Sequence, residues 1–334
     1  MKKSILFILI IVATCSYFTQ GQALNNVLNV KSFTTMKWNS ENGISYSQVP
    51  GANLGVTSFE VLSNDRISYL CNSTNEIIIA KASTNNVIRK FPVAFAPRDF
   101  CYDNNLFYVL SELKIDVYNE YGNHINNFIF SQNYAGTERI ARANNSTYLL
   151  LASGNSLLIE SNGLPIKPNE FEGWISYSGN RVATELTSSN TYKVKFFSIL
   201  GLNSENSFQT DHKVAGVYLV GVNNNRIILD VQTFLTESPI SVERKIISIS
   251  FDNENIKGIE AELKIPNMYY VISNKEFTLS SEGMLYNMIT APEGVFVYSL
   301  SELISGKGIT HYYPDFLTQK SYHFNDHLIN IELK

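Results

Sequence analysis

Residues 58–130 contain two copies of one pattern of four short apolar runs. The first copy has four apolar runs: SFEV (58–61), ISYL (67–70), EIII (76–79) and VIRKF (87–91). The second copy has four more: DFCY (99–102), LFYVL (106–110), KIDVY (114–118) and INNF (125–128). Equivalent positions, such as Phe59 and Phe100, are 41, 39 or 37 residues apart. A period of about forty residues with four strands in each repeat is typical of a β-propeller blade.

The rest of the chain gives four further candidate blades. They cover residues 138–171, 174–197, 214–266 and about 268–317. The fifth blade carries a longer insertion, Gln232 to Glu243, between its second and third strands, and a helical turn is expected at Ser299 to Ile304 in the sixth. Turns rich in Asn and Gly separate the runs, and these residues accept the positive φ that tight turns need.

Both ends of the chain supply strand patterns. We expect two strands at the amino end, 28–38 and 43–49, and a hairpin at the carboxy end, 320–324 with 327–333. Together they would make one composite blade and close the ring, which removes two unpaired sheet edges. The sequence therefore predicts an all-β, seven-bladed propeller. The alternative is six blades, with the terminal strands added to existing ones.

Composition supports a large folded core and excludes one class of function. Hydrophobic residues make up 44% of the 334 residues and charged residues 17%. The 26 Lys and Arg are scattered, and the net charge is −4. Because nucleic-acid binding needs a concentrated positive face, we expect no nucleic-acid partner.

The amino terminus has the pattern of a targeting segment. Lys2 and Lys3 precede an uncharged stretch from Ser4 to Ala13, which predicts a signal peptide over residues 1–23 with cleavage after Ala23. The alternative is lipoprotein processing before Cys15. Residues 24–334 then form a single propeller domain. No later apolar run is long enough to span a membrane, so we expect a periplasmic or secreted protein, or one anchored through Cys15.

Two cysteines remain after the expected cleavage, Cys71 and Cys101. An oxidising compartment would permit a disulfide between these neighbouring blades. The alternative is two buried thiols that pack as small hydrophobic groups.

The repeat resembles exported β-propellers of the broad class that includes NHL-type and quinoprotein-like repeats. The matching residues are those of the two copies in 58–130 and the run Glu282-Gly283-Met284-Leu285-Tyr286-Asn287. The signal segment and the frequent Asn, Ile and Lys are similar to those of Bacteroidetes secretory proteins. The markers of WD, sialidase-like and kelch repeats are missing, so the resemblance implies a fold and assigns no functional residue.

Motifs for catalysis or metal binding are weak. His323 and His327 are four residues apart, but a hairpin turn between them puts the two residues out of step. The sequence shows no Gly-x-Ser-x-Gly elbow and no zinc-ligand spacing. We therefore predict no metal, no cofactor and no catalytic residue.

Candidate binding residues come from the geometry of propellers, where loops that enter the innermost strands meet on one face. Loops on a rigid scaffold often carry function, and Arg and large aromatic side chains are enriched at binding hot spots. The candidates are Arg98, Glu138, Arg139, Trp174 and Tyr269. The competing interpretation is structural, with Arg98 paired to Asp99 and Trp174 packed between blades.

The resulting functional hypothesis is a non-enzymatic interaction module. Its partner would be another exported or outer-membrane protein, and one version docks on or caps a secretion channel. One alternative is a hydrolase or lyase acting on a carbohydrate or lactone, with Asp99, Glu138 and Glu276 converging at the channel mouth. The other is glycan binding without catalysis.

Overall fold

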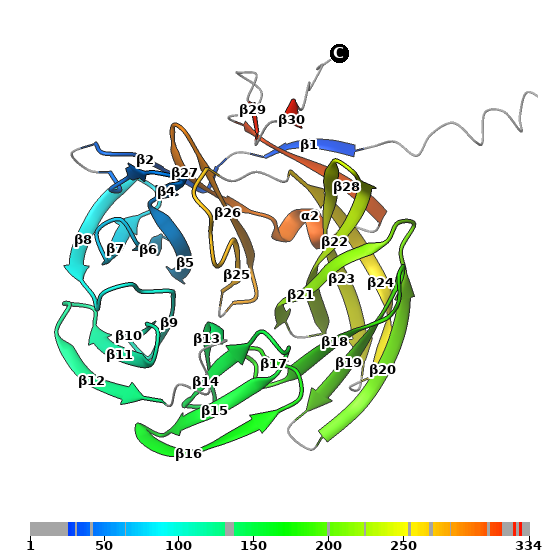
Figure 1. Cartoon of the computed structure of the whole chain (residues 1–334), viewed down its shortest axis with the longest axis horizontal. Helices are drawn as coiled ribbons and strands as arrows, with labels where there is room; N and C mark the ends of the chain where they lie inside the picture. The colour runs from blue at the N-terminus through cyan, green and yellow to red at the C-terminus, as the bar shows by residue number, and fades with distance from the viewer. Residues whose placement is uncertain are drawn as a thin grey trace, which may run out of the picture.

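The computed structural model is a ring of β-sheets (Figure 1), and residues of its innermost strands line a central channel that contains two cavities. It describes residues 26–30, 32–40, 43–63, 65–130, 137–198, 201–223, 225–252, 255–266, 270–280, 282–305, 308–315, 323–324 and 327–328. The predicted signal peptide, with Cys15, lies outside these residues, and so does Tyr269. No helix in the described part of the chain is long and apolar enough to cross a membrane.

Blades 1 and 2 have the strands predicted from the repeated pattern. Blade 1 consists of β5 (Val56–Ser63), β6 (Arg66–Cys71), β7 (Glu76–Lys81) and β8 (Asn86–Pro92). Blade 2 consists of β9 (Asp99–Asp103), β10 (Leu106–Leu110), β11 (Lys114–Asn119) and β12 (His124–Ile129). Each blade is antiparallel, and its first strand lies nearest the channel (Figure 1). Asn75, Asn85 and Asn104 have positive φ in the turns, which explains the frequent Asn.

Blades 3 and 4 each contain one outer strand more than the sequence predicted. Blade 3 consists of β13 (Thr137–Ala143), β14 (Ser146–Leu151), β15 (Ser156–Ser161) and β16 (Leu164–Phe171). Blade 4 consists of β17 (Trp174–Ile175), β18 (Arg181–Ser188), β19 (Thr191–Ser198) and β20 (Gly201–Gln209). The additional strands, β16 and β20, are mostly exposed, β16 contains two prolines and β20 is largely polar, so neither has the buried apolar pattern that marks the others.

Blade 5 belongs to a six-stranded sheet. Its strands are β21 (Val214–Asn223), β22 (Arg226–Glu237), β23 (Ile240–Asp252) and β24 (Asn255–Ile265), followed by β28 (Gly308–Pro314) and β1 (Asn26–Val30). The prediction that Gln232 to Glu243 form an insertion between two strands is wrong. The ladder between β22 and β23 continues through it to the pair Glu237 and Ile240, so the segment is the end of a long hairpin.

Blade 6 is completed from the other end of the chain. It consists of β25 (Phe277–Leu279), β26 (Leu285–Ala291), β27 (Gly294–Ser299) and, on the outside, β2 (Thr34–Lys37). The expected helical turn is confirmed as α2 (Ser301–Ser305). Thr34 pairs with Val297, and Met36 on β2 is 1% exposed. This one strand therefore closes the ring.

The seven-bladed prediction is wrong, and the six-bladed alternative is confirmed. Among the described residues, the predicted blade made from strands of both chain ends does not form, because the terminal segments go to different places. β2 joins blade 6, β1 pairs in parallel with β28, and β3 (Ser47–Val49) pairs with β4 (Ala52–Leu54). The carboxy-terminal hairpin is present as β29 (His323–Phe324) and β30 (His327–Leu328) in a separate sheet. In it Phe324 is opposite His327, so the two histidines are out of step as predicted.

The core lies between blades. Phe59 and Phe100, equivalent in the two copies, are both fully buried. Met36 packs in one cluster with Phe59 and Val297, which joins blade 1 to blade 6. Cys71 and Cys101 are both buried and free, so the structure has buried thiols in place of the possible disulfide. Packing between neighbouring blades holds the innermost strands in position around the channel.

Candidate functional site

Two cavities lie along the channel. The entrance cavity, about 610 Å³, lies where the innermost strands begin. The exit cavity, about 250 Å³, lies where these strands end. Both cavities are lined by the same five residues at the waist between them: Arg139, Trp174, Leu219, Val220 and Phe277.

The entrance cavity brings together four of the five predicted binding residues: Arg98, Glu138, Arg139 and Trp174. Arg98 precedes β9, Glu138 and Arg139 are on β13, and Trp174 begins β17. They converge because all three strands start at the same end of the ring. The fifth, Tyr269, lies outside the described residues. The expected pairing of Arg98 with Asp99 is replaced by a pair between Asp99 and Lys275.

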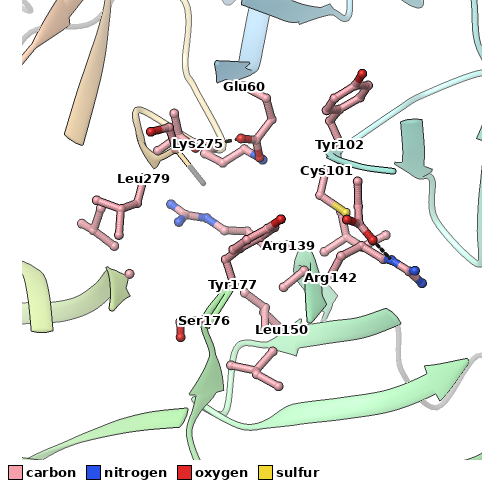
Figure 2. Close-up of a pocket in the computed structure, with 18 of the residues that line it drawn as sticks. Glu60, Cys101, Tyr102, Arg139, Arg142, Leu150, Ser176, Tyr177, Lys275 and Leu279 are labelled. Carbon is pink, nitrogen blue, oxygen red and sulfur yellow. Dashed lines mark hydrogen bonds and ion pairs between the residues drawn. The ribbon is translucent and has the colours of Figure 1, made fainter. Parts of the chain in front are cut away.

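Arg139 is held in a fixed orientation between the two cavities. Its Nε donates to the carbonyl oxygen of Asn274 at 3.1 Å, and its guanidinium lies 5.6 Å from the centre of the Trp174 ring. The indole Nε1 of Trp174 donates to the carbonyl of Leu151 at 2.9 Å, which fixes the ring. Figure 2 shows Arg139 reaching into the middle of the exit cavity. Within the described part of the chain, Arg139 forms no ion pair with a carboxylate.

Three other charged residues of the entrance cavity neutralise one another: Arg244, Asp230 and Glu276. Arg244 lies 2.6 Å from Asp230 and 2.6 Å from Glu276. Burial lowers the pKa of Arg244, but the two carboxylates outweigh it, and the pKa is raised above its usual value. Sequence reasoning missed this cluster. The available signal was a single acidic residue, Asp230, inside the apolar run RIILDV, which indicates a buried and partnered carboxylate.

A second cluster closes the channel wall between blades. Lys275 lies 2.8 Å from Glu60 of β5 and 3.0 Å from Asp99 of β9, and Figure 2 shows the pair with Glu60. The hydroxyl of Thr278 donates to Glu60 at 2.8 Å, and Asp99 accepts from the backbone N–H of Ile140 at 3.1 Å. Burial lowers the pKa of Lys275, but Asp99 and Glu60 outweigh it and the pKa is raised.

The three carboxylates of the enzyme hypothesis are not brought together as a cation site. Asp99 pairs with Lys275, Glu276 pairs with Arg244, and Glu138 is exposed at the cavity edge. Among the described residues, no group of three His, Cys, Asp or Glu side chains is placed to hold a metal ion.

The exit cavity has its own paired charges. Arg142 lies 2.6 Å from Glu160 and 3.1 Å from Asp103, with its guanidinium 4.3 Å from the centre of the Tyr108 ring. Cys101 lies in the same wall, and burial raises the pKa of its thiol well above the usual value. A protonated, buried thiol is a poor nucleophile.

A third cavity, about 220 Å³, adjoins the entrance cavity and is lined by residues of blades 3, 4 and 5. The two cavities share Glu138, Trp174, Tyr218 and Leu219. The remaining lining is mixed: Val182, Leu186 and Val217 form an apolar part, and Ser153, Thr184 and Glu185 are polar. The same face exposes large apolar side chains: Leu186 is 54% exposed, Tyr218 42% and Ile272 72%.

Comparison with solved structures confirms the propeller fold. The chain is similar to hydrazine synthase from Kuenenia stuttgartiensis, with a TM-score of 0.51 and 13% identity over 78% of this chain and 81% of that one. A streptogramin B lyase structure aligns with a TM-score of 0.41 and 11% identity, over 78% of this chain and 100% of the other. No known family and no curated protein matches the sequence. At these identities the likeness concerns the fold alone.

Proposed function

We propose that this protein is a non-enzymatic binding module that holds a partner at the entrance face of the propeller. The observation that carries the proposal is Arg139, whose guanidinium lies at the waist between the two cavities, near Trp174 and without a carboxylate partner in the described chain. Arg and Trp are the residues most often found at binding hot spots. The exposed Leu186, Tyr218 and Ile272 add apolar contact area on the same face.

The pairing of the acidic residues favours binding over hydrolysis or elimination. A general base needs a carboxylate within reach of a substrate proton. Asp230 and Glu276 are both engaged by Arg244, and Asp99 is fully buried against Lys275. These contacts stabilise the ring and leave Asp99, Asp230 and Glu276 little capacity to act as acids or bases.

We propose an exported protein as the partner. The positive segment at Lys2 and Lys3 and the apolar stretch after it support export. The partner is then a secreted or outer-membrane protein, and a disc-shaped propeller suits a subunit that docks on or caps a secretion channel. Membership in the NHL-like or quinoprotein-like class rests on the sequence resemblance.

Affinity capture tests the proposal. The tagged protein, expressed in the organism that encodes it, is cross-linked and recovered from the cell envelope. We expect a stoichiometric partner with the wild type, and at least tenfold less with Trp174→Ala or Arg139→Gln. The control is Arg89→Gln, on the outermost strand of blade 1, which should recover the partner as the wild type does. Absence of a stoichiometric partner, or equal recovery by all variants, would contradict the proposed function.

A further inference from the structure

We infer that the entrance face binds the carboxy-terminal end of a peptide, with its free carboxylate on Arg139 and its last apolar side chain in the third cavity. This inference rests on the proposed function and names the chemistry that the partner presents.

The carboxylate is assigned from the unused donors of Arg139. Its Nε is occupied by the carbonyl of Asn274, which sets the plane of the guanidinium. The two Nη groups have no hydrogen-bond acceptor among the described residues. A planar guanidinium with two parallel N–H groups matches a carboxylate in a bidentate arrangement. The buried ring of Trp174 lies beside the guanidinium, and a lower local dielectric strengthens a charge-assisted hydrogen bond.

The charge balance of the entrance cavity excludes a polyanion. Its wall holds three arginines, Arg98, Arg139 and Arg244, and three acids, Glu138, Asp230 and Glu276. A phosphate-rich or polyuronate chain would meet these carboxylates at close range, which is unfavourable. A ligand with a single negative charge avoids this repulsion.

The apolar side chain is assigned from the third cavity. Trp174, Tyr218 and Leu219 form a common wall between this cavity and the entrance cavity. A ligand carboxylate in the entrance cavity is therefore close to a ligand side chain in the third cavity. The apolar lining from Val182, Leu186 and Val217 favours an aliphatic side chain.

Glu138 favours a peptide over a simple fatty acid. Glu138 lies at a register shift between Thr137 and Arg139, and it lines the entrance and third cavities, whereas Arg139 lines the entrance and exit cavities. Glu138 is exposed, lines both the entrance and the third cavities, and has no partner among the described residues. Its carboxylate can accept the amide N–H groups that a peptide carries and a fatty acid lacks.

Calorimetric titration of the full chain tests the inference with matched probes: acetyl-Ala-Ala-Leu as the free acid, the same peptide as its carboxamide, and acetyl-Ala-Ala-Gly as the free acid. We expect the leucine acid to bind at least tenfold more tightly than the amide, as for loss of one charge-assisted contact. It should also bind several-fold more tightly than the glycine acid.

Variants locate the two subsites. Arg139→Gln should make acid and amide equal, and Arg139→Lys should retain part of the preference because the charge remains without the fork. Leu186→Asp, at a half-exposed position, should abolish the preference for leucine over glycine. Arg89→Gln, on the outermost strand of blade 1, should bind as the wild type does. Circular dichroism confirms that each variant is folded.

Equal binding of acid and amide by the wild type would overturn the inference, and so would no binding of either at millimolar concentration. An acid preference that survives Arg139→Gln would also overturn it. The proposed function would still stand in these cases if partner capture required Trp174 and Arg139. If no partner is captured but the wild type still prefers the leucine acid over its amide, the proposed function fails while the peptide inference stands.

Discussion

The ammonium of Lys275 lies 3.0 Å from the carboxylate of Asp99, although the two residues are far apart in the sequence. Lys275 precedes the first strand of blade 6, and Asp99 begins blade 2. Asp99 is fully buried and Lys275 is 7% exposed. With Glu60 of blade 1 and the backbone of Ile140 in blade 3, the pair links four blades across the channel wall.

Removing Lys275 should destabilise the propeller strongly. Lys275→Met leaves Asp99 and Glu60 without their cation, and breaking a buried pair from one side costs about 3–5 kcal/mol. Guanidinium unfolding followed by circular dichroism measures the change. The matched control is Lys193→Met, whose pair with Glu205 is partly exposed and should change stability by less than about 1 kcal/mol. Equal effects from the two variants would contradict the role of the buried cluster.

The carboxylate of Glu120 should stabilise the folded protein near neutral pH and lose this effect in acid. Burial raises its pKa, but the Tyr102 hydroxyl and Arg66, 3.0 Å away, outweigh it and the pKa is lowered. A lowered pKa stabilises the fold above the unfolded pKa, about 4.3, and this contribution is lost as pH falls through the folded pKa.

The test of this pH dependence is urea unfolding at several pH values. The wild type should exceed Glu120→Gln in stability by less than about 1 kcal/mol near pH 7, because the carboxylate is partly exposed and screened by solvent. The difference should shrink below about pH 4.3. Tyr102→Phe should give an intermediate result, since Arg66 remains. A difference that grows as pH falls would disprove the assignment.

Cys71 and Cys101 should resist alkylation in the folded protein. Both are buried, and burial raises the pKa of the Cys101 thiol, so little thiolate is present near pH 8. Iodoacetamide followed by peptide mapping should label neither residue in buffer and both in denaturant without reductant. Labelling that required a reductant would show a disulfide and contradict the free thiols.

Gly173 should tolerate no side chain. Its φ is +86°, and an added Cβ would lie 2.9 Å from the carbonyl carbon of Val182, a backbone atom that cannot move aside. Gly163 has a similar φ of +82° but open space around it, so Gly163→Ala isolates the backbone strain, roughly 1–2 kcal/mol. Gly173→Ala should cost clearly more in denaturant unfolding and should weaken partner capture, because Trp174 follows directly. Equal costs would show that the close contact relaxes.

The sequence predicted the blades well where the apolar pattern is strong. In blades 1 and 2 every strand was identified, because the runs around Phe59 and Phe100 are buried and alternate with Asn-rich turns. The blade count was wrong for a physical reason. The strand at Thr34 to Lys37 has no local signal for its partner, and only the unfilled edge of β27 decides where it pairs.

The candidate site was predicted in part for a similar reason. Arg98, Glu138, Arg139 and Trp174 were found because the starts of innermost strands converge in any propeller. Arg244 and Lys275 were missed because their partners come from other strands or other blades. No spacing in the sequence predicts these ion pairs. Their acidic partners did carry a signal, as lone charges inside apolar runs.

Closure of the ring by β2 sets an order on folding. Beside this strand, Trp38 donates its indole N–H to the carbonyl of Ala291, a contact between residues 253 positions apart. Contacts between distant residues form slowly, because the chain must first lose the entropy of a long loop. β2, which is synthesised early, thus waits for β27, which is synthesised late. Until β2 pairs with β27, Met36 and the edge of β27 lack their partners. An unpaired strand edge of this kind is a site of aggregation in a partly folded chain.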